Sequence, residues 1–301
     1  MRNRRSRAGG SLPDWKRRSR GVSVPTRLTR HPVSRVARRK GGTTSAVRIV
    51  PEETPVAFSY GGTTHAVMMA TPSDMEDFAV GFSLSEGIIE NASDIREIAV
   101  EDHDQGIDIQ ITLAGDRREA LNRRRRHMAG PVGCGLCGIE SIDEALKPVA
   151  LVGSNLHLTA GDIAQSVKLL SARQPLHTET GAVHAAGFYV PGKGIVAARE
   201  DVGRHNALDK LAGALARQGI DGANGAVVVT SRVSIEMVQK TAITGAPVLI
   251  AVSAPTALAI RTAEAAGITL VALVRGDEFD IYTHTDRIET AFCSQVEPDV
   301  A

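Results

Sequence analysis

Apolar and polar residues alternate with a period of two in the segment that follows residue 45, and this alternation is typical of β-strands. Gly61 and Gly62 interrupt it and predict the turn of a hairpin. Apolar residues then recur every three or four positions, which predicts a helix that begins after capping groups at Thr71 to Asp74 and ends near Gly87. The predicted strands are 47–50, 55–60, 64–69, 96–100 and 108–113, and the predicted helix is 75–86.

The second half of the chain alternates between short runs that are apolar at nearly every position and stretches with helical periodicity. The predicted strands are 182–190, 194–199, 226–230, 248–252 and 269–274, and the predicted helices are 159–173, 202–217, 234–244 and 256–266. Wholly apolar strands are buried on both faces, and strand–helix–strand connections favour a right-handed parallel sheet. The pattern therefore predicts an α/β fold with a helix-flanked sheet and a smaller N-terminal β-rich subdomain.

Charge divides the chain into two unequal parts. The first 40 residues hold 14 Lys or Arg and one acid, whereas the remaining residues hold 21 bases and 33 acids. We interpret residues 1–44 as a disordered basic tail, because they contain no apolar run that could form a core, a secretory signal or a membrane span. Contact with nucleic acid or an acidic protein, and an organellar transit peptide, are the alternatives for this tail.

Polar clusters follow three of the apolar strands. They are Thr230 to Arg232, Ser253 to Thr256 and Arg275 to Asp277. Because ligands gather at the carboxyl ends of strands in such sheets, the clusters predict a pocket lined by basic and hydroxyl groups. Arg232 and Arg275 supply the basic groups of this predicted pocket. The clusters contain no Gly-x-Gly-x-x-Gly turn and no phosphate-loop sequence, so a standard dinucleotide or ATP site is not indicated.

The chain has three cysteines, and two of them, Cys134 and Cys137, form a Cys-x-x-Cys pair flanked by glycines. A small, odd number of cysteines favours a reducing compartment, which predicts a cytoplasmic protein. The spacing suits a structural zinc site, a thioredoxin-type redox pair or a sulfur carrier, and a pair without chemistry also stays open.

Context weakens two of these alternatives. A zinc site requires two more ligands, and the remaining cysteine, Cys293, lies in the C-terminal tail, which leaves His127 and His184 as candidates. A thioredoxin-type pair follows the first strand of a small domain, whereas this pair follows an arginine cluster at 123–126. We interpret that cluster as a solvated face, with docking of a sulfur donor or binding of phosphate as the alternative.

Several other polar residues have both a structural and a functional interpretation. Asp201 either caps the helix that follows it or positions a ligand together with His205. Ser231 and Ser234 either cap the next helix or lie beside a bound anion at its N-terminus. His184 lies in an apolar run, where a hydrogen-bonded core histidine is expected and a role in a site is the alternative.

Five longer motifs carry more information than the cysteine spacing. They are 133–140 (GCGLCGIE), 180–186 (TGAVHAA), 200–210 (EDVGRHNALDK), 231–240 (SRVSIEMVQK) and 252–256 (VSAPT). Taken in this order, they resemble the formate dehydrogenase accessory sulfurtransferase family, FdhD, over about residues 45–285.

The resemblance implies a sulfurtransferase that accepts sulfur from a cysteine desulfurase. It would pass this sulfur to molybdenum bis(molybdopterin guanine dinucleotide) cofactor, bound as a substrate, before the cofactor enters formate dehydrogenase. A non-catalytic chaperone that holds and delivers the cofactor is the alternative. The resemblance further implies a homodimer, with no nucleic acid and no membrane as partner. Cys134 matches the family's persulfide-bearing cysteine and Cys137 matches the second thiol.

The family's cofactor-binding stretch matches six consecutive residues, Leu273, Val274, Arg275, Gly276, Asp277 and Glu278, to which the strand-end argument adds Ser231 and Arg232. The implied fold is cytidine deaminase-like, but the deaminase zinc motifs are missing, so no metal site is expected. The predicted divisions are the tail at 1–44, an N-terminal α+β subdomain at 45–130, a thiol loop and connecting helix at 131–175, an α/β cofactor-binding domain at 176–288 and a C-terminal tail at 289–301.

Overall fold

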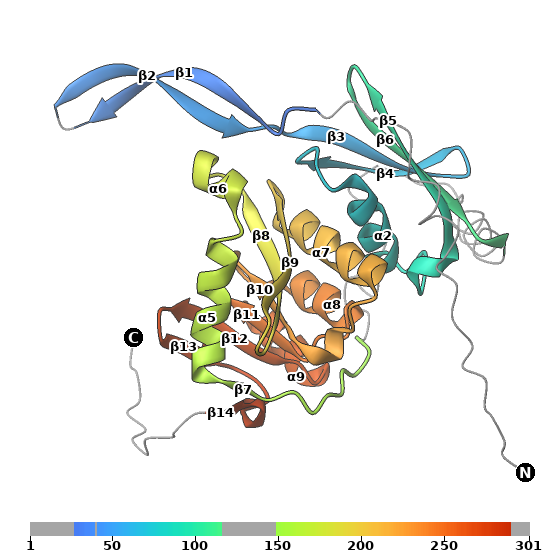
Figure 1. Cartoon of the computed structure of the whole chain (residues 1–301), viewed down its shortest axis with the longest axis vertical. Helices are drawn as coiled ribbons and strands as arrows, with labels where there is room; N and C mark the ends of the chain where they lie inside the picture. Colours follow the sequence, from blue (N-terminus) through green and yellow to red (C-terminus); the bar gives the residue numbers. More distant parts are fainter. Residues whose placement is uncertain (1–26, 40, 116–148, 290–301) are drawn as a thin grey trace, which may run out of the picture.

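The computed structural model describes residues 27–39, 41–115 and 149–289 (Figure 1). Cys134, Cys137, Cys293 and the arginine cluster at 123–126 lie outside the described residues. Within the described ranges the chain forms a mixed α/β structure, in which a six-stranded sheet, a four-stranded sheet and two two-stranded sheets are present. No described helix is long and apolar enough to cross a membrane.

The six-stranded sheet has the order β13-β12-β11-β10-β8-β9. Its strands are β8 (His184–Val190), β9 (Gly194–Asp201), β10 (Ala226–Val229), β11 (Val248–Ala251), β12 (Thr269–Arg275) and β13 (Glu278–Ile281). The three central strands, β10 to β12, pair in parallel, as the apolar runs predict. The outer strands β8, β9 and β13 pair antiparallel with their neighbours, so the sheet is mixed rather than wholly parallel. A cytidine deaminase-like arrangement stays a prediction.

Helices cover both faces of this sheet (Figure 1). One face carries α7 (Arg204–Gln218), α8 (Ile235–Ile243) and α9 (Ala257–Ala265), and the other carries α5 (Ala160–Ser171). Because successive strand residues point to opposite faces, Val227 and Val229 join the first core and Val228 joins the second. The predicted helix-flanked sheet is therefore confirmed. The remaining elements here are α6 (Pro175–Thr180) and the parallel pair β7 (Leu158–Thr159) with β14 (Ile288–Glu289).

The N-terminal subdomain is a four-stranded sheet packed on one helix. Its elements are β3 (Thr54–Tyr60), β4 (Thr63–Ala70), α2 (Met75–Ser85), β5 (Ile95–His103) and β6 (Gly106–Leu113), in the sheet order β4-β3-β6-β5. The predicted hairpin turn is confirmed, and both Gly61 and Gly62 have positive φ, at 61° and 78°. The rings of Phe58 and Phe82 stack with centroids 4.1 Å apart in the core beneath α2.

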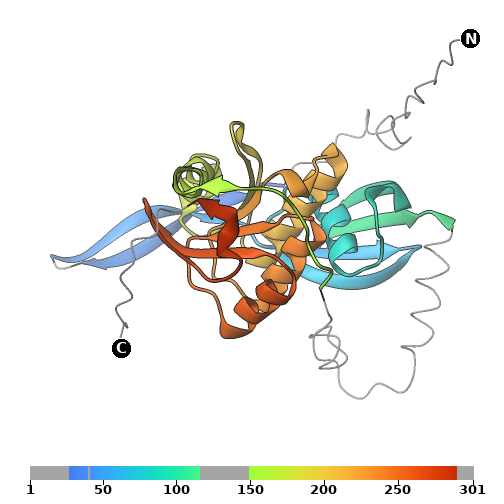
Figure 2. The same cartoon turned by 90° about the horizontal axis from the view of Figure 1, so that it is seen from below.

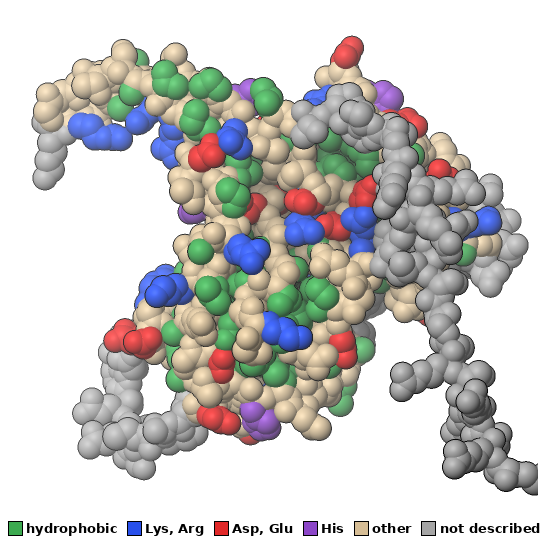
Figure 3. All heavy atoms as spheres, viewed as in Figure 1, with side chains coloured by type: hydrophobic (Ala, Val, Ile, Leu, Met, Phe, Trp, Pro, Cys, Tyr) green, Lys and Arg blue, Asp and Glu red, His purple; other side chains and the backbone are tan. Residues whose placement is uncertain are grey.

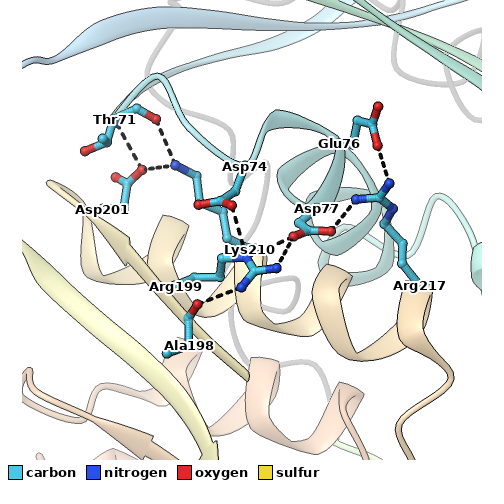
Figure 4. A network of polar contacts seen from close by, with 9 residues as sticks. All are labelled: Thr71, Asp74, Glu76, Asp77, Ala198, Arg199, Asp201, Lys210 and Arg217. Atoms are coloured by element: carbon cyan, nitrogen blue, oxygen red, sulfur yellow. Dashed lines mark hydrogen bonds and ion pairs between the residues drawn. The ribbon is translucent and has the colours of Figure 1, made fainter. Parts of the chain in front are cut away.

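One expectation about α2 is wrong. Asp74 stands at the N-cap position in the left-handed region, with φ 55°, and makes no side-chain cap hydrogen bond. Its carboxylate instead lies 3.4 Å from the Arg199 guanidinium (Figure 4). The side chain thus connects the subdomain to the central sheet, a contact between residues far apart in sequence that no local pattern could predict.

The expectation of a disordered tail up to residue 44 is wrong for its last part. β1 (Arg30–Arg39) and β2 (Gly42–Pro51) form an antiparallel ribbon that projects from the body as an arm (Figures 1 and 2). Lys and Arg side chains gather along one side of this arm (Figure 3). Arg30 pairs with Glu179, and Arg48 donates to the Thr180 carbonyl oxygen at 2.9 Å. These anchors to α6 explain the order, because an isolated two-stranded ribbon is barely stable in water.

The subdomain and the central sheet are joined by a close crossing of α2 and α7. A Cβ placed on Gly81 would lie 1.7 Å from the Asp209 carbonyl oxygen, and one placed on Gly213 would lie 1.8 Å from the Asp77 carbonyl oxygen. Only glycine fits at both positions, so the two helix backbones touch directly. The Asp77 carboxylate also accepts hydrogen bonds from Arg199 and Arg217 across this crossing (Figure 4). The crossing therefore fixes the subdomain against α7.

Candidate functional site

The candidate site is the edge of the six-stranded sheet where four strands end. β9 and β10 both pair antiparallel with β8, so β9 ends at the same edge as the parallel strands β10, β11 and β12. His184, the first residue of β8, lies at this edge opposite Asp201, the last residue of β9. The chain continues from these strand ends into Arg204, Arg232 and the β12–β13 turn at Arg275. Residues from His184 to Arg275, far apart in the sequence, are thus brought to one edge of the sheet.

Hydrogen bonds between neighbouring strand ends give the edge a fixed shape. The Thr230 hydroxyl accepts from the Ala185 amide at 2.9 Å, and the Thr230 amide donates to the Ala185 carbonyl oxygen at 3.1 Å. On the other side of β10, the Val252 amide donates to the Val229 carbonyl oxygen at 3.1 Å. A Val233–Pro255 bridge extends the parallel pairing beyond the strand ends. The loops that carry the polar residues are therefore held by the sheet.

Three arginines at the edge have no acidic partner among the described residues. Arg204 is half-buried and its Nε makes no hydrogen bond there, while Arg232 is exposed. Arg275 donates to the carbonyl oxygens of Val252 and Val274. Guanidinium groups without carboxylate partners, in a chain whose acids outnumber its bases beyond residue 40, create a local positive potential. This combination favours the binding of a multiply charged anion.

Helix N-termini add backbone donors at the same edge. α7 begins after Gly203 and α8 begins after Ser234, and neither cap position supplies a side-chain hydrogen bond to the first turn. Uncapped first-turn amides, together with the helix dipole, stabilise anions. α9 differs, because the Thr256 hydroxyl accepts from the Ala259 amide at 3.2 Å. The Ser234 side chain therefore does not cap α8, and the capping interpretation of this residue is wrong.

Ser231 is nearly buried, and its hydroxyl donates to the Arg232 carbonyl oxygen at 3.0 Å. This bond shapes the turn that presents Arg232. A direct ligand contact by Ser231 stays a prediction.

The two histidines of the edge both have a pKa below the ordinary value for histidine. Burial lowers the pKa of His184, and the charges of Arg204 and His177 lower it further against the opposing effect of Asp201. Burial likewise lowers the pKa of His205, which Glu236 partly offsets. His184 is partly exposed rather than enclosed in the core, so the core-histidine interpretation is wrong. Neutral imidazoles can gain a proton when an anion binds beside them.

His205 faces a carboxylate from the next helix. Its Nε2 lies 2.8 Å from Glu236 Oε2, but the approach lacks hydrogen-bond geometry. One turn further along α7, the buried Asp209 carboxylate accepts from Lys240 Nζ at 2.6 Å and from the Ser85 hydroxyl at 2.6 Å. Asp209 of α7 is thus paired with Lys240 of α8 behind the edge, whereas Arg204, Arg232 and Arg275 have no acidic partner in the described part of the chain.

The stretch from Leu273 to Glu278, which the sequence predicts to bind a cofactor, has an unusual backbone. Leu273 has φ 56°, and the pairing of β12 with β13 shifts register between Ala272 and Arg275. A β-bulge redirects side chains, and a non-glycine residue in the left-handed region carries a conformational cost that functional sites often hold. Here the bulge exposes Leu273 and turns Arg275 back toward the end of β11.

Four residues that the sequence predicts as site candidates, Arg232, Arg275, His184 and His205, all lie at or beside this edge. Arg204 lies there too, although among the sequence predictions it occurs only within the 200–210 motif. Asp201 is not a cap for α7. It is fully buried and pairs with Lys210.

A second group of described residues could hold a metal ion. Glu101, His103 and Asp108 on the β5–β6 hairpin place one ligand atom each within 4.8 Å of one another. Two of the three are exposed, and the neighbouring Asp102 is already paired with Arg27. A nearby guanidinium disfavours a cation, so this group does not change the assignment of the candidate site.

Comparisons with known proteins give the family context. Residues 51–289 match the model of the FdhD/NarQ family. A sulfur carrier protein FdhD from Agrobacterium fabrum is 61% identical over 270 residues, covering 89% of this chain and 98% of that protein. The protein of the same name from Brucella abortus is 56% identical over 257 residues, which cover 85% of this chain and 96% of that protein. A crystal structure from Desulfotalea psychrophila, of a proposed formate dehydrogenase accessory protein, has a TM-score of 0.70 and 27% identity, covering 87% of this chain and 100% of that chain.

Proposed function

Because this chain belongs to the FdhD/NarQ family, we propose that it is a sulfur carrier that serves formate dehydrogenase. The observation that carries the proposal is the 61% identity, over 89% of this chain, to a relative named as a sulfur carrier protein. The Cys134/Cys137 pair supplies thiols of the required kind. The anion-binding edge supplies a place for a phosphate-rich substrate.

Sulfur uptake is a thiol exchange at Cys134. The Cys134 thiolate attacks the terminal sulfur of a persulfide on a cysteine desulfurase. The donor's sulfur–sulfur bond breaks, its cysteine leaves as a thiolate, and a new sulfur–sulfur bond forms on Cys134. No electrons are gained or lost overall in this step. The carrier then holds one sulfur atom in a reactive but reversible form.

Sulfur release involves Cys137. Once the sulfur acceptor is bound, the Cys137 thiolate attacks the Cys134 sulfur atom of the persulfide, which frees the terminal sulfur as sulfide and leaves a Cys134–Cys137 disulfide. The two electrons needed to form sulfide come from the two cysteines. A cellular dithiol reductant restores both thiols. The spacing of two residues between the cysteines suits this exchange, because it allows the sulfur atoms to meet.

The sulfide acceptor is the molybdenum bis(molybdopterin guanine dinucleotide) cofactor, which binds as a substrate. Arg204, Arg232 and Arg275 hold its diphosphate groups, assisted by the first-turn amides of α7 and α8. The bulged stretch from Leu273 to Glu278 forms one wall of the site. His184 and His205 add hydrogen-bond donors that become charged as the anion binds.

The proposed setting is the cytoplasm, with a cysteine desulfurase as the donor and formate dehydrogenase as the recipient. A homodimer is part of the same proposal. Neither a membrane nor a nucleic acid is needed for it.

The alternative function is a chaperone that holds the cofactor and delivers it without carrying sulfur. Complementation of a cell that lacks the gene distinguishes the carrier from the chaperone, because only a carrier requires the thiol. We expect the Cys134→Ala chain to leave formate dehydrogenase inactive in such a cell, while a Cys293→Ala chain restores its activity. Restoration by Cys134→Ala would establish the chaperone in place of the carrier.

A further inference from the structure

A single buried carboxylate connects the candidate site to the N-terminal subdomain. Asp201 Oδ2 accepts hydrogen bonds from the Thr71 amide at 3.0 Å and from Lys210 Nζ at 2.6 Å (Figure 4). Asp201 Oδ1 accepts from the Gly203 amide at 2.8 Å and from Asn206 Nδ2 at 3.0 Å. Four donors from two distant parts of the chain thus converge on one side chain.

Thr71 completes a closed set of bonds, which we call the Thr71 joint and which consists of Thr71, Asp201, Asn206 and Lys210. The Thr71 carbonyl oxygen accepts from Lys210 Nζ at 2.8 Å, and its hydroxyl accepts from the Val202 amide at 3.1 Å. Asn206 also reaches the subdomain, because its Nδ2 donates to the Met69 carbonyl oxygen at 2.8 Å. The loop between β4 and α2 is therefore tied to the start of α7 at every polar group of Thr71.

The ion pair in this joint is buried completely. The side chains of Asp201 and Lys210 have no exposed surface, and Lys210 Nζ lies 5.3 Å from the centre of the Phe78 ring. Burial lowers the pKa of Lys210, and Asp201 opposes that effect. A buried ion pair typically adds little net stability compared with apolar side chains of the same size. The ion pair instead fixes the geometry of the joint, because its charges and hydrogen bonds are satisfied in one arrangement.

The joint and the edge share the same short segment. Asp201 is the last residue of β9 and is opposite His184, and Val202 and Gly203 lead directly to Arg204 and His205 in the first turn of α7. Three of the bonds described above hold Val202, Gly203 and Asn206, which surround these two residues. A shift of the Thr71 loop would therefore move the α7 N-terminus.

We propose that Asp201 and Lys210 are positioning residues for the anion-binding edge, and that occupancy of the edge is energetically coupled to docking of the Thr71 loop. This inference rests on the proposed function in one respect, which is that the edge binds the guanine dinucleotide end of the cofactor. A ligand held by Arg204 and the α7 amides stabilises the α7 N-terminus. By linkage, the bound ligand then stabilises the Thr71 joint. Loosening of the joint lowers the affinity for the ligand by the same factor.

The test combines two measurements on the full chain with guanosine diphosphate as the probe. Titration calorimetry gives the affinity, and hydrogen–deuterium exchange resolved to single amides gives the protection of Thr71, Val202 and Gly203. In the wild-type chain we expect the probe to slow exchange of these amides. In Lys210→Met, which keeps the length of the side chain but removes its charge and donors, we expect affinity to fall about fivefold or more and the added protection to disappear.

Controls separate positioning from general loss of stability. Lys168→Met removes an exposed lysine from α5 and should leave both measurements unchanged. Thr159→Ala removes the cap of α5, so it lowers stability at a distance and should leave the affinity unchanged. If Lys210→Met does not fold, Thr71→Val serves instead, because it removes the acceptor for the Val202 amide and leaves the ion pair intact. A smaller loss of affinity is expected from it.

The outcomes are distinguishable. Binding of the probe to the wild-type chain without added protection at Thr71, or wild-type affinity in a folded Lys210→Met chain, would overturn the coupling and leave the proposed function standing. No binding of the probe to the wild-type chain would overturn both the coupling and the assignment of the edge as the cofactor site.

Discussion

The contact between Gly81 and Gly213 predicts a large effect from adding one methyl group. In Gly213→Ala the new Cβ would lie 1.8 Å from the Asp77 carbonyl oxygen, and the Gly81 amide nitrogen would lie 2.8 Å away. Both neighbours are backbone atoms of α2, so they cannot move aside as a flexible side chain can. α2 and α7 must therefore separate by roughly 1.5 Å to reach ordinary van der Waals contact.

Separation has an energetic cost that can be bounded. Overpacking of this kind costs about 1–3 kcal/mol, and alanine recovers about 1 kcal/mol of helix propensity relative to glycine. The separation also stretches the hydrogen bonds from Arg217 and Arg199 to Asp77 and loosens the Thr71 joint. We expect a net loss of about 2 kcal/mol in the free energy of unfolding.

Urea unfolding followed by circular dichroism measures this loss. The matched control is Gly161→Ala in the first turn of α5, where a Cβ would meet its nearest neighbour at 3.6 Å. That variant should be as stable as the wild-type chain or slightly more stable. Equal midpoints for Gly213→Ala and Gly161→Ala would refute the argument that the two helix backbones are in direct contact.

Three further predictions follow from the described residues. Arg204→Gln should weaken guanosine diphosphate binding by about tenfold or more, because a charge-assisted hydrogen bond is lost, whereas Arg261→Gln on the exposed face of α9 should leave calorimetric affinity unchanged. The pKa values of His184 and His205 are lowered in the folded chain, so the unfolded chain binds more protons. The free energy of unfolding should therefore fall as the pH drops through 6.5. Denaturation curves of His184→Gln should show a smaller fall over the same pH range. Thr159→Ala should cost about 1 kcal/mol in urea unfolding, because the hydroxyl accepts from the Asp162 amide at 3.1 Å; an unchanged midpoint would contradict the capping role.

The centre of the six-stranded sheet could be predicted from sequence because β10 and β11 are apolar at every position. Runs such as 226–230 and 248–252 have few alternatives to a strand buried on both faces, and the intervening helices have a clear periodicity. The antiparallel outer strands β8, β9 and β13 could not be distinguished from parallel ones in this way. Strand direction depends on connections and partners rather than on composition.

The arm was missed for a physical reason. β1 contains five arginines or histidines in ten residues, and the arm is held by contacts with α6 that join residues far apart in the chain, Arg30 with Glu179 and Arg48 with Thr180. Local composition carries no record of such contacts. The same holds for two acids that precede helices. Asp74 is expected to cap, and a cap is one of the two interpretations of Asp201, whereas their partners Arg199 and Lys210 come from tertiary packing.

The candidate site was predictable where a strand end determines it. Arg232 and Arg275 each follow an apolar strand, so topology alone places them at one edge. Arg204 was missed because β9 had to be recognised as a member of the same sheet before its end could be assigned to that edge. The bulge at Leu273 leaves no signal in the sequence, since a leucine rarely adopts a positive φ.

The central claim is that Cys134 carries sulfur, and the intact mass of the chain tests it most directly. The full chain is incubated with a cysteine desulfurase and cysteine, separated from small molecules without reductant, and weighed beside Cys134→Ala and Cys293→Ala. We expect the wild-type and Cys293→Ala chains to gain the mass of one sulfur atom, which a thiol reductant removes, and Cys134→Ala to gain none. A wild-type chain whose mass does not change would contradict the sulfur-carrier account.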